Sequence, residues 1–331
     1  MPCNTPLYTY NDGCFYKHVA CLTSLILEYI LRPSHIFFNM HKKKALIAEY
    51  KVGAYIVPSH NIAFSDFNPE GKEVLVCNHS LITNSHDFDF LAQDMSKDFR
   101  IIAIDMPGRG DSDWFEDGDL YNYEVYIADF LSLMEYLEVK QFHFLGTSMG
   151  GIAGMALASK YPGMLKSLIL NDIGPHLPGK ALAKIRKYVG MQVPMPTYSV
   201  AKKTMQMIFK YFGIKQEQHW DHVTKYNTRK GRLGLLYMNY DPKIAQNFIV
   251  DFDNPKDIEF WEIWDQMEDI PILLIQGEKS NILTQETVDK MNKRHNMDLY
   301  IIKDVGHAPS LFEHKEIKYI ESWLMNIKQS C

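Results

Sequence analysis

From about residue 50 to the C-terminus, short apolar stretches alternate with longer segments of helical periodicity. The apolar stretches are rich in β-branched residues, and the later ones are almost entirely apolar, as expected for strands buried on both faces of a parallel sheet. This pattern predicts strands over Gly53–Val57, Ile62–Phe67, Glu73–Cys77, Phe99–Ile104, Gln141–Leu145, Ser167–Leu170, Ile272–Ile275 and Leu299–Ile302. Apolar positions three or four residues apart predict helices over Asp87–Met95, Tyr123–Leu137, Met149–Ser159, Glu286–Arg294 and Glu316–Ile327.

The order of these elements predicts the fold class. Strands that alternate with helices indicate an α/β fold, in which helices flank a mainly parallel sheet. The alternation stops over residues 176–254, which read as helices interrupted by Pro and Gly and rich in Met and aromatic residues. We interpret this segment, called the insertion below, as a helical domain between two strands of the sheet. The predicted organisation is an extension at 1–49, a core over 50–175 and 255–331, and the insertion.

The first 39 residues differ in pattern from the rest of the chain. Their densest apolar stretch, Val19–Leu31, includes Glu28 and falls short of the roughly 20 apolar residues that cross a bilayer. Several apolar residues share one helical face, which predicts membrane contact through residues 17–38 or packing on the body of the protein. A second interpretation stays open, in which Met40 is an alternative start and residues 1–39 do not belong to the functional protein.

Composition and charge narrow the functional class. The 331 residues are 46% hydrophobic and 23% charged, an ordinary globular composition that argues against a disordered or fibrous protein. Because the formal net charge is −5, we expect no nucleic-acid partner. The five cysteines include no Cys-x-x-Cys pair, which favours reduced thiols in a cytoplasmic protein over a zinc site or disulfides. The isolated Gly108-x-Gly110 is too short for a dinucleotide fingerprint, and we expect neither a metal nor another cofactor.

A Gly-x-Ser-x-Gly motif predicts a nucleophile. The segment Gly146-Thr147-Ser148-Met149-Gly150 follows an apolar strand and opens a helix rich in small residues. In this context the motif is a nucleophile elbow, because a sharp turn strains the serine backbone and the two glycines let strand and helix approach closely. The Ser148 hydroxyl is then expected at the carboxyl edge of the sheet, above the positive end of a helix dipole.

A serine nucleophile needs a general base, which is usually a histidine. Among the 13 histidines, His307 follows the last predicted strand and precedes the last predicted helix. This loop belongs to the same carboxyl edge as Ser148, and the chain order of serine, acid and histidine is the one that this architecture uses. We therefore predict that His307 is the base.

The negative charge of a tetrahedral intermediate requires backbone N–H donors. One donor is expected from Met149, directly after the nucleophile, and a second from the loop that follows the third strand. That loop contains His79-Ser80-Leu81, and we predict that the N–H groups of Leu81 and Met149 form the oxyanion hole. The expected role of His79 is structural support of the loop, and substrate binding is the alternative.

In these motifs the chain resembles an α/β-hydrolase of the esterase, lactonase and carbon–carbon hydrolase type from about residue 50 to the C-terminus. The matching segments are Asp105–Ser112 after the fourth strand, Gly146–Gly151 at the elbow, and Gly306-His307. The resemblance implies an eight-stranded, mainly parallel sheet and a helical cap between the sixth and seventh strands, where the pattern breaks. These segments do not discriminate between substrates.

Two positions depart from the family pattern. The family usually has His-Gly in the oxyanion loop, whereas this chain has Ser80, which would add strain on the order of 1 kcal/mol if a Gly-like backbone angle is needed. Ser80 could also narrow the pocket or add a hydroxyl donor. The family's triad acid usually follows the seventh strand, where this chain has Asn281. Asn can orient an imidazole, but in a serine protease the equivalent Asp-to-Asn change lowered turnover by about 10⁴.

Three models for the third triad member stay open. In the first, Asp172 completes the triad, since some α/β-hydrolases place the acid after the sixth strand, although an Asp before Gly-Pro is also typical of a turn. In the second, Asn281 orients His307 in a slow or specialised enzyme. In the third, catalysis is lost and the pocket only binds. Glu278 and Asp304 are weaker substitutes.

The motifs together predict a cytoplasmic serine hydrolase that cleaves a carboxylic ester, thioester or lactone with an apolar acyl part. The Met and aromatic residues of the insertion indicate an apolar pocket, although most of them are also needed for the insertion's own core. The expected partner is a small ester-like molecule. Carbon–carbon hydrolysis, acyl transfer and a non-catalytic binding protein of the same fold are the alternatives.

Overall fold

The computed structural model describes residues 42–267, 269–293 and 297–330 of the chain. The chain divides into a unit over residues 1–39 and a second over residues 40–331, and only the second is described below. The segment predicted to contact a membrane, residues 17–38, lies outside the described residues. Within the described ranges, no helix combines the length and apolarity required to span a bilayer.

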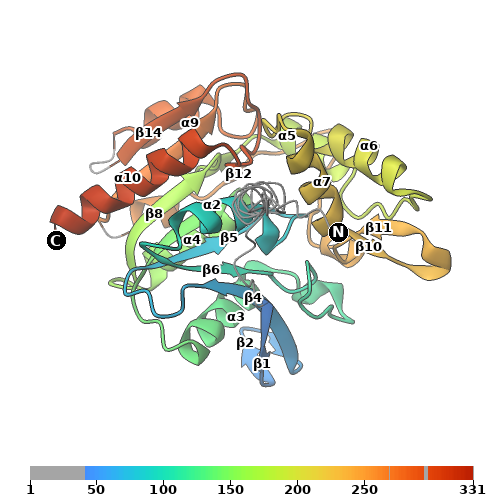
Figure 1. The fold of residues 1–331 in the computed structure, drawn as a ribbon, viewed down its shortest axis with the longest axis horizontal. Coiled ribbons are helices and arrows are strands. Elements are labelled where there is room, and N and C mark those ends of the chain that lie inside the picture. Colours follow the sequence, from blue (N-terminus) through green and yellow to red (C-terminus); the bar gives the residue numbers. More distant parts are fainter. Residues whose placement is uncertain (1–41, 268, 294–296, 331) are drawn as a thin grey trace, which may run out of the picture. The chain divides into compact units, whose positions relative to one another are not determined.

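The centre of the second unit is an eight-stranded sheet with the strand order β1-β4-β6-β5-β7-β8-β13-β14 (Figure 1). Its strands are β1 (Lys42–Ile47), β4 (His60–Phe67), β5 (Val74–Asn78), β6 (Arg100–Ile104), β7 (Phe142–Thr147), β8 (Leu165–Asn171), β13 (Ile272–Gly277) and β14 (Met297–Ile302). The β1–β4 and β4–β6 pairs are antiparallel, and all other neighbours are parallel. The predicted fold class, a mainly parallel α/β sheet, is confirmed.

The beginning of the sheet differs from the prediction. The stretch at 53–57 was expected to form the first strand, but β3 (Tyr55–Val57) pairs with β2 (Tyr50–Val52) in a separate hairpin. The strand that opens the sheet is β1, at residues assigned to the extension. Its sequence begins with three lysines, and only Ala45 and Ile47 are buried. Lysines are common on edge strands, because they discourage further strand pairing, and here they hide the apolar alternation.

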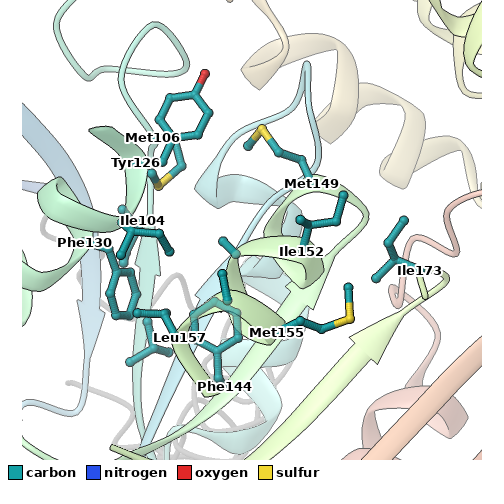
Figure 2. Close-up of a cluster of buried hydrophobic side chains, with 14 of the residues drawn as sticks. Ile104, Met106, Tyr126, Phe130, Phe144, Met149, Ile152, Met155, Leu157 and Ile173 are labelled. Atoms are coloured by element: carbon teal, nitrogen blue, oxygen red, sulfur yellow. The ribbon is translucent and has the colours of Figure 1, made fainter. Parts of the chain in front are cut away.

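Helices cover both faces of the sheet, and successive strand residues point to opposite faces. On one face, α2 (Asp89–Met95) and α10 (His314–Ser330) pack against residues such as Leu145. On the other face, the core cluster that contains Phe144 includes residues of the helices α3 (Tyr123–Tyr136), α4 (Met149–Lys160), α8 (Trp261–Asp265) and α9 (Gln285–Met291). Figure 2 shows this second layer, in which side chains of α4 and α3 surround Phe144.

The insertion leaves the sheet after β8 and returns before β13. It contains the helices α5 (Gly179–Arg186), α6 (Tyr198–Ile208) and α7 (Glu217–Tyr226) and the hairpin of β10 (Thr228–Lys230) and β11 (Leu236–Met238), which lie together in Figure 1. Its two ends are joined, because β9 (His176–Leu177) pairs antiparallel with β12 (Ile258–Glu259). Short 3₁₀ helices complete the described elements: η1 (Ser85–Phe88), η2 (Gly118–Leu120), η3 (Arg232–Gly234) and η4 (Pro242–Ala245).

Candidate active site

Ser148 lies in the sharp turn between β7 and α4, with backbone angles φ 51° and ψ −112°. Residues with a side chain rarely adopt a positive φ, and such strained positions cluster at functional sites. A Cβ atom on Gly146 would lie 2.4 Å from the carbonyl carbon of Gly150, and one on Gly150 would lie 2.3 Å from the carbonyl oxygen of Asn78. Only glycine therefore allows α4 to begin so close to the ends of β7 and β5.

Three side chains from distant parts of the sequence meet at this edge of the sheet. The Ser148 Oγ lies 2.9 Å from Nε2 of His307, and Nδ1 of the same imidazole lies 2.7 Å from Oδ2 of Asp172. Ser148 follows β7, Asp172 follows β8 and His307 follows β14. The structure thus brings together the arrangement of the first sequence model.

Asp172 is fully buried and accepts hydrogen bonds from three donors in two segments of the chain. Besides the imidazole, the N–H group of Gly277 donates to its Oδ1 at 2.7 Å, and the Ser280 hydroxyl donates to its Oδ2 at 2.6 Å. A carboxylate removed from water is stable only when such donors replace its hydration. Asp172 also has a positive φ of 56° and lies at a bend in the backbone.

The other candidates for the acid lie elsewhere. Asn281 is exposed and lines the neighbouring cavity. Asp304 is exposed and pairs with Lys279 at 2.6 Å, and Glu278 accepts the N–H group of Asp304. The loop that was expected to supply the acid instead supplies Ser280, which holds the carboxylate of Asp172 and which sequence reasoning did not identify.

The two residues predicted to supply the oxyanion-hole N–H groups come from separate segments of the chain. Met149 is the first residue of α4, and Leu81 belongs to the loop after β5. Both residues line the same cavity as Ser148 and His307. Within the described ranges, neither backbone N–H group donates to a protein acceptor, so both are free to bind a ligand oxygen.

A buried arginine holds both of these residues. Nε of Arg109 donates to the carbonyl oxygen of Leu81 at 2.9 Å, Nη1 donates to the Tyr126 hydroxyl at 2.6 Å, and Nη2 lies 3.6 Å from the Met149 sulfur. Arg109 is fully buried, and among the described residues no carboxylate lies within ion-pair distance of it. Sequence reasoning included Arg109 only as part of the motif at 105–112, because a motif does not reveal where a long side chain points.

His79 and Ser80 shape the loop that carries Leu81. Nδ1 of His79 donates to the Ser80 carbonyl at 2.6 Å, while Nε2 accepts the N–H group of Met106 at 3.0 Å. Burial lowers the pKa of His79 to about 4, so the ring is neutral, and its role is the predicted structural one. The backbone of Ser80 does not have a positive φ, so the strain considered for a Gly-like backbone angle does not arise. Its hydroxyl instead lies 2.8 Å from that of Thr83.

A cavity of about 560 Å³ opens above Ser148 and His307. Its floor is continuous with the core, since Tyr126, Met149, Ile152 and Ile173 of the cluster in Figure 2 also line it. Further apolar lining comes mainly from the insertion and the residues that flank it: Leu177, Ala181, Leu182, Ile185, Val189, Met207, Ile208, Phe209, Phe212, Ile244 and Phe248. Other methionines of the insertion, including Met195, Met205 and Met238, are buried in a hydrophobic cluster that extends from the insertion to the core beneath it.

Comparison with known proteins agrees with this fold. Residues 73–314 match the model of the family described as the alpha/beta hydrolase fold. A 3-hydroxybutyrate-oligomer hydrolase from Cupriavidus necator is 33% identical over 267 residues, which are 78% of this chain and 90% of that protein. The fold and the site therefore define a hydrolase of the α/β class, and the chain belongs to the alpha/beta hydrolase fold family.

Solved structures show the same relationship. A protein from Rickettsia typhi is 41% identical with a TM-score of 0.82, covering 87% of this chain and 99% of that one. An alpha/beta hydrolase from Novosphingobium aromaticivorans is 28% identical with a TM-score of 0.74, covering 86% and 99% of the two chains.

Proposed function

We propose that the protein is a serine hydrolase that cleaves carboxylic esters with an apolar acyl part through an acyl-enzyme. The observation that carries this proposal is the continuous hydrogen-bonded chain from Ser148 through His307 to the buried Asp172, placed at the floor of an apolar cavity of about 560 Å³. A nucleophile, its base and an orienting carboxylate in hydrogen-bond contact are the machinery of acyl transfer.

In the first half-reaction, the Ser148 Oγ forms a bond with the ester carbonyl carbon while its proton moves to Nε2 of His307. Asp172 keeps the imidazole oriented and stabilises its charged form. The electron pair of the carbonyl bond moves to oxygen, where the N–H groups of Leu81 and Met149 bind it, each contributing roughly 3 kcal/mol. The carbon–oxygen bond to the alcohol then breaks, and the alcohol leaves with the proton from His307.

In the second half-reaction, water attacks the acyl carbon and gives a proton to His307. The same N–H groups bind the second oxyanion. When the bond to the Ser148 Oγ breaks, this oxygen recovers the proton and the carboxylic acid is released. Thioesters and lactones would react by the same steps, because each presents an acyl carbon with an oxygen or sulfur leaving group.

Two observations support an ester with an apolar chain. The cavity lining is mostly apolar, with a few neutral polar groups such as Ser80, Asn122 and Asn247, which suits an aliphatic or oligoester chain. The related C. necator protein is named for 3-hydroxybutyrate oligomers, and units of a hydroxy acid are joined by ester bonds.

The test is labelling by a fluorophosphonate probe together with hydrolysis of 4-nitrophenyl butyrate. We expect the protein to be labelled and to turn over, and we expect Ser148→Ala to remove labelling and to lower kcat by about 10⁴-fold or more. Ser199→Ala, at an exposed position of α6, is the matched control and should retain both signals. An intact protein that neither reacts with the probe nor hydrolyses esters would contradict the proposal and favour a binding protein.

A further inference from the structure

The insertion has the opposite charge to the rest of the protein. Residues 176–254 contain 13 Lys and Arg against 5 Asp and Glu, whereas the other 252 residues contain 22 and 35. Lys203, Lys210 and Lys215, in and after α6, are exposed. Charges of one sign gathered on one segment create a field that attracts oppositely charged ligands. This segment is also the one that supplies much of the lining of the cavity.

The lining itself carries the same sign. Among the described residues that line the cavity there is no Asp or Glu, and one Lys is present, Lys184 on α5. Lys184 is exposed, as are Tyr188 and Tyr211, so these three residues mark the mouth of the cavity. In the part of the chain that the structure describes, Lys184 forms no ion pair. Its ammonium group is thus available to a ligand at the mouth.

The inner end of the cavity is not negative either. Asp172 lies behind His307, fully buried, and its carboxylate is engaged by three donors. Beside Leu81 and Met149 lies the guanidinium group of Arg109, for which no described carboxylate is within ion-pair distance. A substrate therefore meets a positive group at the mouth, and the buried guanidinium group behind Leu81 and Met149 adds positive potential near the floor.

We propose that the cavity accepts esters that carry a free carboxylate at the end remote from the reacting bond, and that Lys184 binds this carboxylate. The inference rests on the proposed esterase function and adds the charge of the substrate. A carboxylate at the mouth gains a charge-assisted hydrogen bond from an ammonium group that otherwise faces water, and the field of the insertion raises its encounter rate. An uncharged ester gains neither, and a cationic ester is repelled.

The test compares each acid with its methyl ester, which removes the charge at the end remote from the reacting bond. The first pair is mono-4-nitrophenyl adipate and its methyl ester, with the carboxylate in the acyl half. The second is 4-carboxyphenyl hexanoate and its methyl ester, with the carboxylate in the alcohol half. In at least one of the two pairs, we expect kcat/KM for the acid to exceed kcat/KM for its methyl ester by about three- to ten-fold in low salt. Adding 0.5 M NaCl should reduce this ratio of acid to methyl ester, because salt screens the charges.

Variants on one helix identify the residue. Lys184→Gln should bring the ratio of kcat/KM between acid and methyl ester close to one. Lys187→Gln, at the exposed C-terminus of α5 and outside the cavity lining, should leave the ratio unchanged. Equal kcat/KM within both pairs, or a ratio that Lys184→Gln does not lower, would overturn the inference while leaving the esterase function intact.

Binding gives a readout that does not require turnover. The monobutyl amide of adipic acid and its methyl ester can be titrated calorimetrically into the Ser148→Ala protein. We expect the acid to bind several-fold more tightly than the methyl ester, and Lys184→Gln to remove the difference. The same affinity for both amides in the Ser148→Ala protein would reject the charge preference even if no ester were hydrolysed.

Discussion

Asp172 illustrates how single residues at this site depend on contacts that are remote in sequence. Its carboxylate is bound by Gly277, Ser280 and His307, all more than 100 positions further along the chain. Asp172 reaches them because β8 and β13 are neighbours in the sheet, so that the loops after these strands meet. Motif spacing identified Ser148 and His307, but it could not decide between Asp172 and Asn281, since the choice depends on this three-dimensional contact.

We predict that Asp172→Asn lowers kcat for 4-nitrophenyl butyrate by about 10⁴-fold, because the imidazolium formed during the reaction loses its charged partner. Asn281→Asp should not raise kcat, since Asn281 is exposed on the cavity wall. Steady-state kinetics of the two variants, with circular dichroism to verify folding, measures both. A large gain in kcat for Asn281→Asp would assign the acid to the loop after β13.

His79 gives a prediction about stability and pH. Burial lowers its folded-state pKa to about 4, whereas the unfolded chain has the ordinary value near 6.5. Between these values the unfolded state binds one more proton, so the free energy of unfolding falls as the pH falls from 6.5 towards 4. The full shift corresponds to about 3 kcal/mol, lost progressively over that range.

Urea unfolding at several pH values between 7.5 and 4.5 measures this loss. His79→Asn should be less stable at pH 7.5, since it loses hydrogen bonds to Ser80 and Met106, and its stability should depend less steeply on pH. An unchanged slope in His79→Asn would mean that His79 does not titrate in this way.

Among the elements, the central strands could be predicted and the first strand could not. Strands such as β7 and β13 are buried along their whole length, so continuous apolar stretches identify them. The edge strand β1 buries only alternate residues, and its first residue, Lys42, forms ion pairs with two aspartates. Nζ of Lys42 lies 2.7 Å from Oδ2 of Asp105 and 3.0 Å from Oδ2 of Asp111. No local pattern reveals that a lysine at an edge neutralises a carboxylate in the core.

The Lys42–Asp105 contact predicts a specific stability change. Burial alone would raise the pKa of the Asp105 carboxyl, but Lys42 and the N–H groups of Ser85 and Asp111 hold it below its ordinary value. Lys42→Met leaves this fully buried carboxylate without a cation, and we expect a loss of about 3–5 kcal/mol in the free energy of unfolding.

Chemical denaturation measures that loss, and two comparisons test its cause. Lys44→Met, at an exposed position of the same strand, should change stability by less than about 0.5 kcal/mol. Adding Asp105→Asn to Lys42→Met should recover part of the loss, because the unpaired charge is then removed. A single Lys42→Met variant as stable as the wild type would contradict the role given to the ion pair.

At the scale of the whole molecule, the basic insertion and the acidic remainder of the chain predict a behaviour that the net charge alone does not. Although the formal charge is −5, the basic insertion should let the protein bind a cation exchanger at pH 7 in low salt. Lys203→Glu/Lys210→Glu should elute at distinctly lower salt. Lys44→Glu/Lys51→Glu makes the same change in net charge outside the insertion and should shift elution less. Equal shifts would show that the resin senses only the total charge.

The antiparallel contact of β9 with β12 has an implication for how this architecture diversifies. Because His176–Leu177 and Ile258–Glu259 are paired, the chain leaves the core and rejoins it at neighbouring positions. The entropic cost of closing a loop rises only slowly as the loop lengthens. The core therefore tolerates inserted segments of different length and sequence between these two strands. Substrate preference can thus be changed by replacing one continuous segment. Grafting another family member's segment between these two strands should transfer the substrate selectivity of that protein and leave Ser148, His307 and Asp172 in place.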